Sequence, residues 1–141
     1  MEFEDYFKRQ IDEVGKMLAA LLGRLAGLKL EGQFGQGLDI VKQTLNEESV
    51  LNFRELSSVP PDKLIDHLDR KNISHENYEK LAELFFEIAE GLEDTDRAAA
   101  MDFYEKSLKM HLFLNQSGSV YSFERHYKID EIREILDQYK S

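Results

Sequence analysis

The sequence predicts an all-α protein with about five or six helices, arranged as antiparallel hairpins. Apolar residues recur at three- and four-residue steps along several segments, which is typical of helices with one buried face. Alternating runs of the length that a β-sheet requires are missing from the sequence. Glycine, proline, serine and aspartate separate the periodic segments, where helices are expected to begin or end.

Length and charge narrow the possible functions. The chain has 141 residues, enough for one domain with a single core, and we expect one domain over residues 1–141. Its 18 basic and 28 acidic side chains give a formal net charge of −10. Because phosphate neutralisation requires clustered Lys and Arg, nucleic acid and anionic membranes are disfavoured partners.

The cellular compartment is predicted from three features. Cysteine is absent, and the chain starts with the acidic sequence MEFEDYF instead of a basic secretion signal. The longest apolar stretch, Met17 to Leu28, contains Arg24 and is shorter than the roughly 20 residues that span a bilayer. We therefore expect a cytoplasmic protein.

The first predicted helix runs from Glu4 to Leu30. Its apolar stripe begins at Phe7 and Ile11 and continues through Leu28 at helical spacing. In its second half the helix is apolar or small nearly all round, which indicates burial on several sides. We expect this half to form the centre of the fold or of a dimer.

Glycines then mark the first turn. Gly32, Gly35 and Gly37 interrupt the pattern, and helical spacing resumes from Leu38, so residues 1–46 are predicted to form a helix hairpin. Residues 47–74 are predicted to be a connection with one turn of helix and a short helix from Asp62 to Arg70.

Capping residues define the remaining elements. Ser74 is suited to cap a helix from His75 to about Gly91, and the Asp94–Asp96 segment is suited to cap one from Arg97 to Leu114. These two helices make up residues 75–115. In residues 116–141 a last helix is expected from about Ile129 to Tyr139.

The pair of helices in residues 75–115 resembles a tetratricopeptide (TPR) repeat. The resemblance is carried by the segment YEKLAELFFEIAEGLEDTDRAAAMDFYEKSLKM. In the repeat, small residues at the helix crossing allow close approach and aromatic residues fill the space beside them. The small crossing residue would be Ala100, and its neighbours would include Phe85 and Tyr104. The resemblance implies a TPR-like right-handed array of hairpins.

The turn Gly32–Leu38 adds a second resemblance. Its sequence, GQFGQGL, fits the pattern G-x-[FY]-x-x-[AG]-L of a bacterial family of small, acidic, all-helical proteins. That resemblance covers most of the chain and implies architecture only, because its motifs are helix-packing motifs and no characterised activity accompanies them.

A protein-binding module is the function that these features favour. In the TPR register the partner-facing positions are Ala19, Leu22, Gly23 and Ala26 in the first hairpin and Glu76, Glu79, Glu83 and Phe86 in the later pair. An acidic rim beside an apolar floor favours a basic or amphipathic protein segment or peptide. Two further interpretations stay open for the Leu18–Leu28 patch, namely burial inside the monomer and the interface of a homodimer.

An enzyme is a distant third interpretation, because catalytic and cofactor signatures are missing. His75 and Glu76 begin like the zinc pattern H-E-x-x-H, but Glu79 replaces the second histidine. We therefore expect no metal and no cofactor. The cluster of Asp62, Asp66, His67 and Asp69 is interpreted as a solvated helix face, and His111 and His126 as satisfied or exposed side chains.

Overall fold

The computed structural model describes residues 2–48, 50–117 and 122–140, and within these ranges every regular element is a helix. The all-α prediction is thereby confirmed. The described residues contain seven α-helices and two 3₁₀ turns, slightly more than the five or six helices predicted. The additional helix, α3 (Phe53–Ser58), lies where the sequence indicated a single helical turn.

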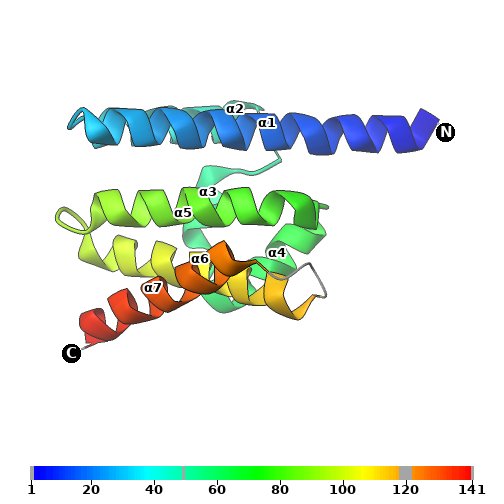
Figure 1. The fold of residues 1–141 in the computed structure, drawn as a ribbon. Coiled ribbons are helices and arrows are strands. Elements are labelled where there is room, and N and C mark those ends of the chain that lie inside the picture. The colour runs from blue at the N-terminus through cyan, green and yellow to red at the C-terminus, as the bar shows by residue number, and fades with distance from the viewer. Residues whose placement is uncertain (1, 49, 118–121, 141) are drawn as a thin grey trace.

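Helices α1 (Glu2–Leu30) and α2 (Phe34–Glu48) form an antiparallel hairpin that makes up one layer of the molecule (Figure 1). Gly32 has a φ of 75°, a conformation that favours glycine, and the amide of Gln33 donates to the carbonyl of Leu28 at 2.7 Å. A Cβ at Gly37 would lie 2.9 Å from Leu25 Cδ1, so glycine permits the close approach of α1 and α2.

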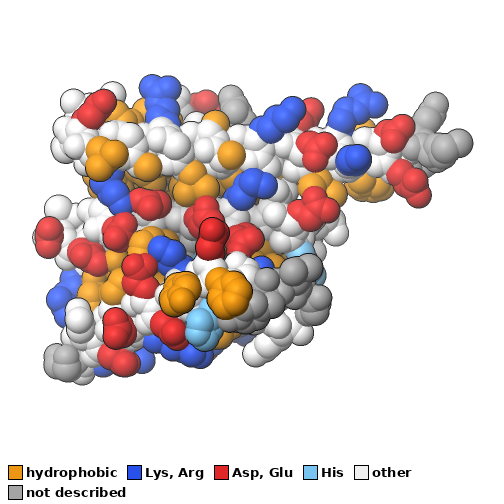
Figure 2. Space-filling model, viewed as in Figure 1, with side chains coloured by type: hydrophobic (Ala, Val, Ile, Leu, Met, Phe, Trp, Pro, Cys, Tyr) orange, Lys and Arg blue, Asp and Glu red, His pale blue; other side chains and the backbone are white. Residues whose placement is uncertain are grey.

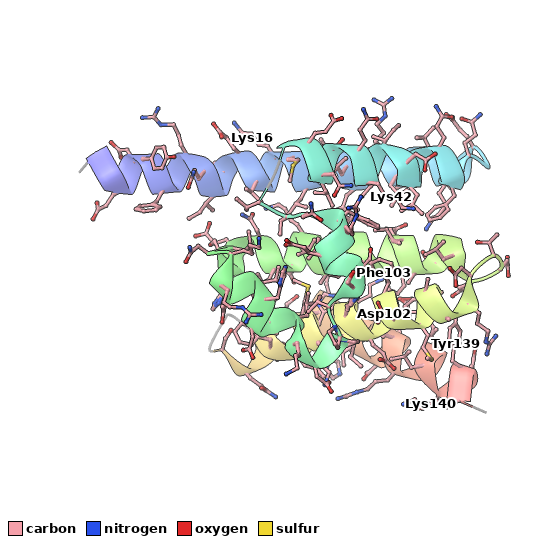
Figure 3. All side chains as sticks on the ribbon, turned by 180° about the vertical axis from the view of Figure 1, so that it is seen from behind. Lys16, Lys42, Asp102, Phe103, Tyr139 and Lys140 are labelled. Atoms are coloured by element: carbon pink, nitrogen blue, oxygen red, sulfur yellow. The ribbon has the colours of Figure 1, made fainter. Side chains whose placement is uncertain are left out.

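Helix α3 and the 3₁₀ turn η1 (Pro61–Lys63) precede α4 (Leu64–Arg70). Viewed from behind, α3 lies between α2, which carries Lys42, and α6, which carries Phe103 (Figure 3). The ring of Phe53 on α3 lies 6.0 Å from that of Phe103, and Lys42 Nζ lies 5.6 Å from the Phe53 ring centroid. Helix α3 thus connects the hairpin layer to the rest of the core.

The second layer is formed by α5 (Tyr78–Leu92), α6 (Arg97–Gln116) and α7 (Phe123–Lys140), and the 3₁₀ turn η2 (His75–Asn77) precedes α5. Asp96 caps α6 through its side-chain oxygen, as predicted. Ser74 caps the 3₁₀ turn η2, which takes the place of the first residues of the predicted helix His75–Gly91, and α5 itself begins at Tyr78. The hydroxyl of Ser107 donates to the carbonyl of Ala82 at 2.8 Å, where α5 and α6 pack closely. Helix α7 begins at Phe123, earlier than the predicted Ile129.

One hydrophobic cluster includes side chains from all seven α-helices. Leu18 and Leu25 on α1 are fully buried in it, which places much of the Leu18–Leu28 patch in the core of the monomer. The N-terminal end of α1 extends beyond the end of α5 (Figure 1). In the described part of the chain, every helix is too short or too polar to cross a membrane.

Candidate functional site

An apolar groove lies beneath the first half of α1, from Phe7 to Met17. Its volume is about 650 Å³. Its apolar lining consists of Phe7, Ile11, Val14 and Met17 on α1, Val50 before α3, and Ile73 before η2. Hydrophobic side chains are visible under this end of α1 in Figure 2. On the apolar stripe of α1, Phe7 is 57% exposed, while Ile11, Val14 and Met17 are partly buried, so the chain itself covers the stripe only in part. Val50, on the other side of the groove, is 55% exposed.

Asn77 fixes the position of α1 at the groove. Its side chain is buried, and Nδ2 donates to the main-chain carbonyl of Ile11 at 3.1 Å. A Cβ at Gly15 would lie 3.0 Å from Asn77 Oδ1, so the glycine allows α1 to approach η2. The rim of the groove is polar and includes Gln10, Glu13 and Lys71. An apolar floor with a polar rim is the usual composition of a protein-binding surface.

A second, smaller pocket of about 240 Å³ lies between α1 and the second layer. Four carboxylates line it, from Glu79, Glu83 and Glu87 on α5 and Glu124 on α7. Its other lining residues are Leu22, Phe86, His111, Arg125 and Lys128. Acidic side chains gather on this face, over α5 and toward α7 (Figure 2). We call this the acidic pocket.

Some charges of the acidic pocket are paired within the protein. Arg125 Nε lies 3.5 Å from Glu79 Oε1, and Arg125 Nη1 donates to Asn115 Oδ1 at 2.9 Å. The ammonium of Lys128 lies 3.7 Å from the ring centroid of Phe86, in a cation–π contact. The side chains of Glu79, Phe86, Arg125 and Lys128 together form one wall of the pocket.

The pKa of the Glu83 carboxyl is affected by the negative charges around it. Partial burial, and then the charges of Glu79 and Glu124, raise the pKa of the Glu83 carboxyl, although Lys128 opposes the shift. The acidic pocket therefore holds an excess of negative charge that its own cations do not fully offset.

His111 on α6 also lines the acidic pocket and differs from the prediction of a satisfied or exposed side chain. The residue is 2% exposed, and neither ring nitrogen has a hydrogen-bond partner among the described residues. Burial, and then the charges of Arg125 and Lys128, lower the pKa of His111 to about 4, so the imidazole is neutral at pH 7.

The structure brings half of the predicted partner surface together. Leu22, Glu79, Glu83 and Phe86 all line the acidic pocket, with Phe86 buried. The others lie outside it. Ala19 and Gly23 are exposed on α1, Ala26 is half-buried, and Glu76 is exposed at η2.

Comparison with protein-family models, curated proteins and solved structures gives no match. The resemblance to TPR repeats and to a bacterial helical family therefore stays a prediction.

The other polar clusters considered from the sequence make contacts within the protein. His75 Nε2 lies 3.6 Å from Asp69, while Glu79 pairs with Arg125. Asp62 pairs with Lys109, and His67 lies near Glu55. Among the described residues, three or more His, Asp or Glu side chains are nowhere grouped suitably to hold a metal ion.

The sequence does not predict the groove, for a physical reason. Its α1 residues were correctly assigned to an apolar helix face, but the sequence pattern does not show where the covering helices end. The other side of the groove comes from short connections around Val50 and Ile73, which carry no binding motif.

Proposed function

We propose that the protein is a non-enzymatic interaction module that binds an amphipathic helix of a partner protein in the α1 groove. The observation that carries this proposal is the partly exposed apolar stripe of α1, which lines a groove of about 650 Å³ and in which Phe7 is 57% exposed. Exposed contiguous apolar surface of this kind commonly marks an interaction site.

The dimensions of the groove favour a helix as the occupant, and the net charge of the whole protein favours a basic one. From Phe7 to Met17, α1 spans about 15 Å at 1.5 Å per residue, or roughly three helical turns. A partner helix of that length places anchors at i, i+3, i+4 and i+7 along the floor. The net charge of −10 favours encounters with a helix whose polar face is basic.

A second candidate function is self-association through the same groove. Lys8 and Arg9 precede the midpoint of the stripe near Ile11, and Asp12 and Glu13 follow it. Two copies of α1 that pack antiparallel about this midpoint bring the basic pair of each copy near the acidic pair of the other. This dimer differs from one built on Leu18 and Leu25, which the core already covers.

Light scattering combined with capture from a lysate of the source cells tests the proposal. A mass near the 16.5 kDa of one chain, with a captured protein that is lost in Phe7→Asp and Val50→Asp, supports the partner helix. Tyr127→Asp is the matched control, because Tyr127 is an exposed aromatic residue on α7 outside the groove. A wild-type mass of twice that value, which falls to the mass of one chain in Phe7→Asp, supports the dimer. Equal capture by all variants would contradict a role for the groove.

A further inference from the structure

The groove on α1 continues the face against which α2 packs. Apolar residues follow one another along α1 at alternating steps of four and three, the spacing of a coiled-coil seam. They are Phe7, Ile11, Val14, Leu18, Leu21, Leu25 and Leu28. At one end of this heptad seam, a Cβ added to Gly37 of α2 would lie 2.9 Å from Leu25 Cδ1 and 3.5 Å from Leu28 Cβ. At the other end, the first three residues of the seam line the groove.

Helix α2 is too short to cover the whole heptad seam. It has 15 residues, whereas α1 has 29. Seen from behind, α2 lies alongside the second half of α1 and ends near Lys16 (Figure 3). Val50, two residues after α2, lines the groove at this point, and the chain then continues to α3. The groove therefore lies where a longer α2 would continue along α1.

We infer that the groove takes a partner helix that runs antiparallel to α1, in line with α2 and in the same direction. This inference rests on the proposed function, because it specifies how the partner helix lies in the α1 groove. Such a helix extends the packing of α1 against α2 by about three turns and supplies apolar anchors at steps of three and four residues. Its N-terminus lies beside Val50 and its C-terminus lies beside Phe7.

The C-terminal end of α2 selects this direction. A helix has partial positive charge at its N-terminus and partial negative charge at its C-terminus. Glu47 adds a carboxylate to the last turn of α2, and the four described residues 45–48 of that turn include no basic side chain. A partner helix that runs in the direction of α2 brings its positive N-terminus to this negative end. The reverse direction would bring two negative ends together.

Crosslinking from the two ends of the groove tests the direction. A photoreactive phenylalanine analogue replaces either Phe7 or Val50, which are both exposed, and the crosslinked residues of the partner from the source cells are mapped by mass spectrometry. Two to three helical turns separate the ends of the groove. We therefore expect the analogue at position 50 to react with a partner residue about seven to ten positions before the one that reacts with position 7.

The possible outcomes separate this inference from the proposed function. The opposite order of crosslinked residues would overturn the inferred direction and leave the groove as a partner site. A lack of crosslinks at both positions would overturn the proposed function and the inferred direction together. Crosslinks from both positions to residues 2–17 of a second copy would show that the occupant is this chain itself, which also overturns the inference.

Reversal of the charge at the end of α2 gives a second readout. The probe is a synthetic peptide of the crosslinked partner segment, and its affinity is measured by calorimetry at about 0.15 M salt, where distant charges are screened. Glu47→Lys should weaken peptide binding by about two- to fivefold, because a lysine would face the positive N-terminus of the partner helix. Glu31→Lys is the matched control, since Glu31 is an exposed residue in the turn at the other end of α2. Stronger binding by Glu47→Lys, or equal effects of the two variants, would contradict the inferred direction.

Discussion

The side-chain amide of Asn77 donates a 3.1 Å hydrogen bond to the main-chain carbonyl of Ile11, across the boundary between the two layers of the fold. Asn77 lies immediately before α5, and Ile11 lies in the part of α1 that lines the groove. This contact fixes one wall of the groove to the body of the protein.

Asn77→Ala should loosen the first half of α1. We expect a loss of about 1 kcal/mol of stability, because one buried hydrogen bond is removed. Hydrogen exchange should become faster for the amides of residues 4–14 than for those of α5 and α6. Gln36→Ala, at an exposed position of α2, should leave the exchange pattern unchanged. Uniform acceleration over the whole chain would show that Asn77 does not hold α1 locally.

Gly91 and Gly23 should respond in opposite directions to alanine. A Cβ at Gly91 would lie 2.1 Å from the Phe34 ring, whereas a Cβ at Gly23 would have no neighbour within 4 Å among the described residues. Gly91→Ala should destabilise the protein by about 1–3 kcal/mol through overpacking. Gly23→Ala should stabilise α1 by up to about 1 kcal/mol, since alanine has the higher helix propensity. Urea unfolding measures the change in stability of both variants. If Gly91→Ala and Gly23→Ala change the stability equally, the Phe34 ring moves freely away from the added Cβ.

Lys106 should be required for the attachment of α3. Its side chain is fully buried, and Nζ donates to the carbonyls of Leu56 at 2.8 Å and Ser57 at 3.0 Å. Lys106→Met preserves most of the volume but removes the donors, and should therefore destabilise the protein by about 1–3 kcal/mol. Lys109→Met removes an exposed ion pair with Asp62 and should change stability by less than about 0.5 kcal/mol. Unchanged stability of the Lys106→Met variant would contradict this role.

His111 should make stability depend on pH. Its pKa is about 4 in the folded protein and 6.5 for an ordinary histidine side chain, so the unfolded chain binds more protons between these two pH values. Stability therefore decreases as the pH falls through this window, by up to about 3 kcal/mol. The effect is isolated by comparing the wild type with His111→Leu at about pH 7 and about pH 4, because the carboxylates titrate in both proteins. A constant difference between the two proteins would show that folding does not lower the pKa of His111.

The sequence is sufficient to predict those elements whose signals lie within a few neighbouring residues. Asp96 caps α6 as predicted, and Ser74 caps the 3₁₀ turn that leads into α5, because capping depends on residues within one turn. Phe85 and Ala100, which are predicted to lie where the two helices of residues 75–115 cross, are both fully buried. Helix α7 was predicted too short, because its first turn has no continuous apolar face to indicate a helix.

The pockets could be predicted only in part, because they depend on contacts between distant segments. Leu22 and Glu83 were predicted as separate positions of a repeat surface, and the structure places both at the acidic pocket. His111 gave no signal in the sequence, since its burial is created by α7 packing against α6. The apolar stripe of α1 was evident, but its incomplete coverage near Phe7 is a property of the assembled layers.

Photo-crosslinking in the source cells tests the role of the α1 groove most directly. A photoreactive phenylalanine analogue replaces Phe7 in one protein and Tyr127 in a control, since both positions are exposed aromatic residues. We predict that the analogue at position 7 forms a crosslink to one partner protein, that this crosslink disappears when Val50→Asp is added, and that position 127 forms none. Equal crosslinking at the two positions, or a crosslink at position 7 that persists with Val50→Asp, would contradict the assignment of the groove as the interaction site.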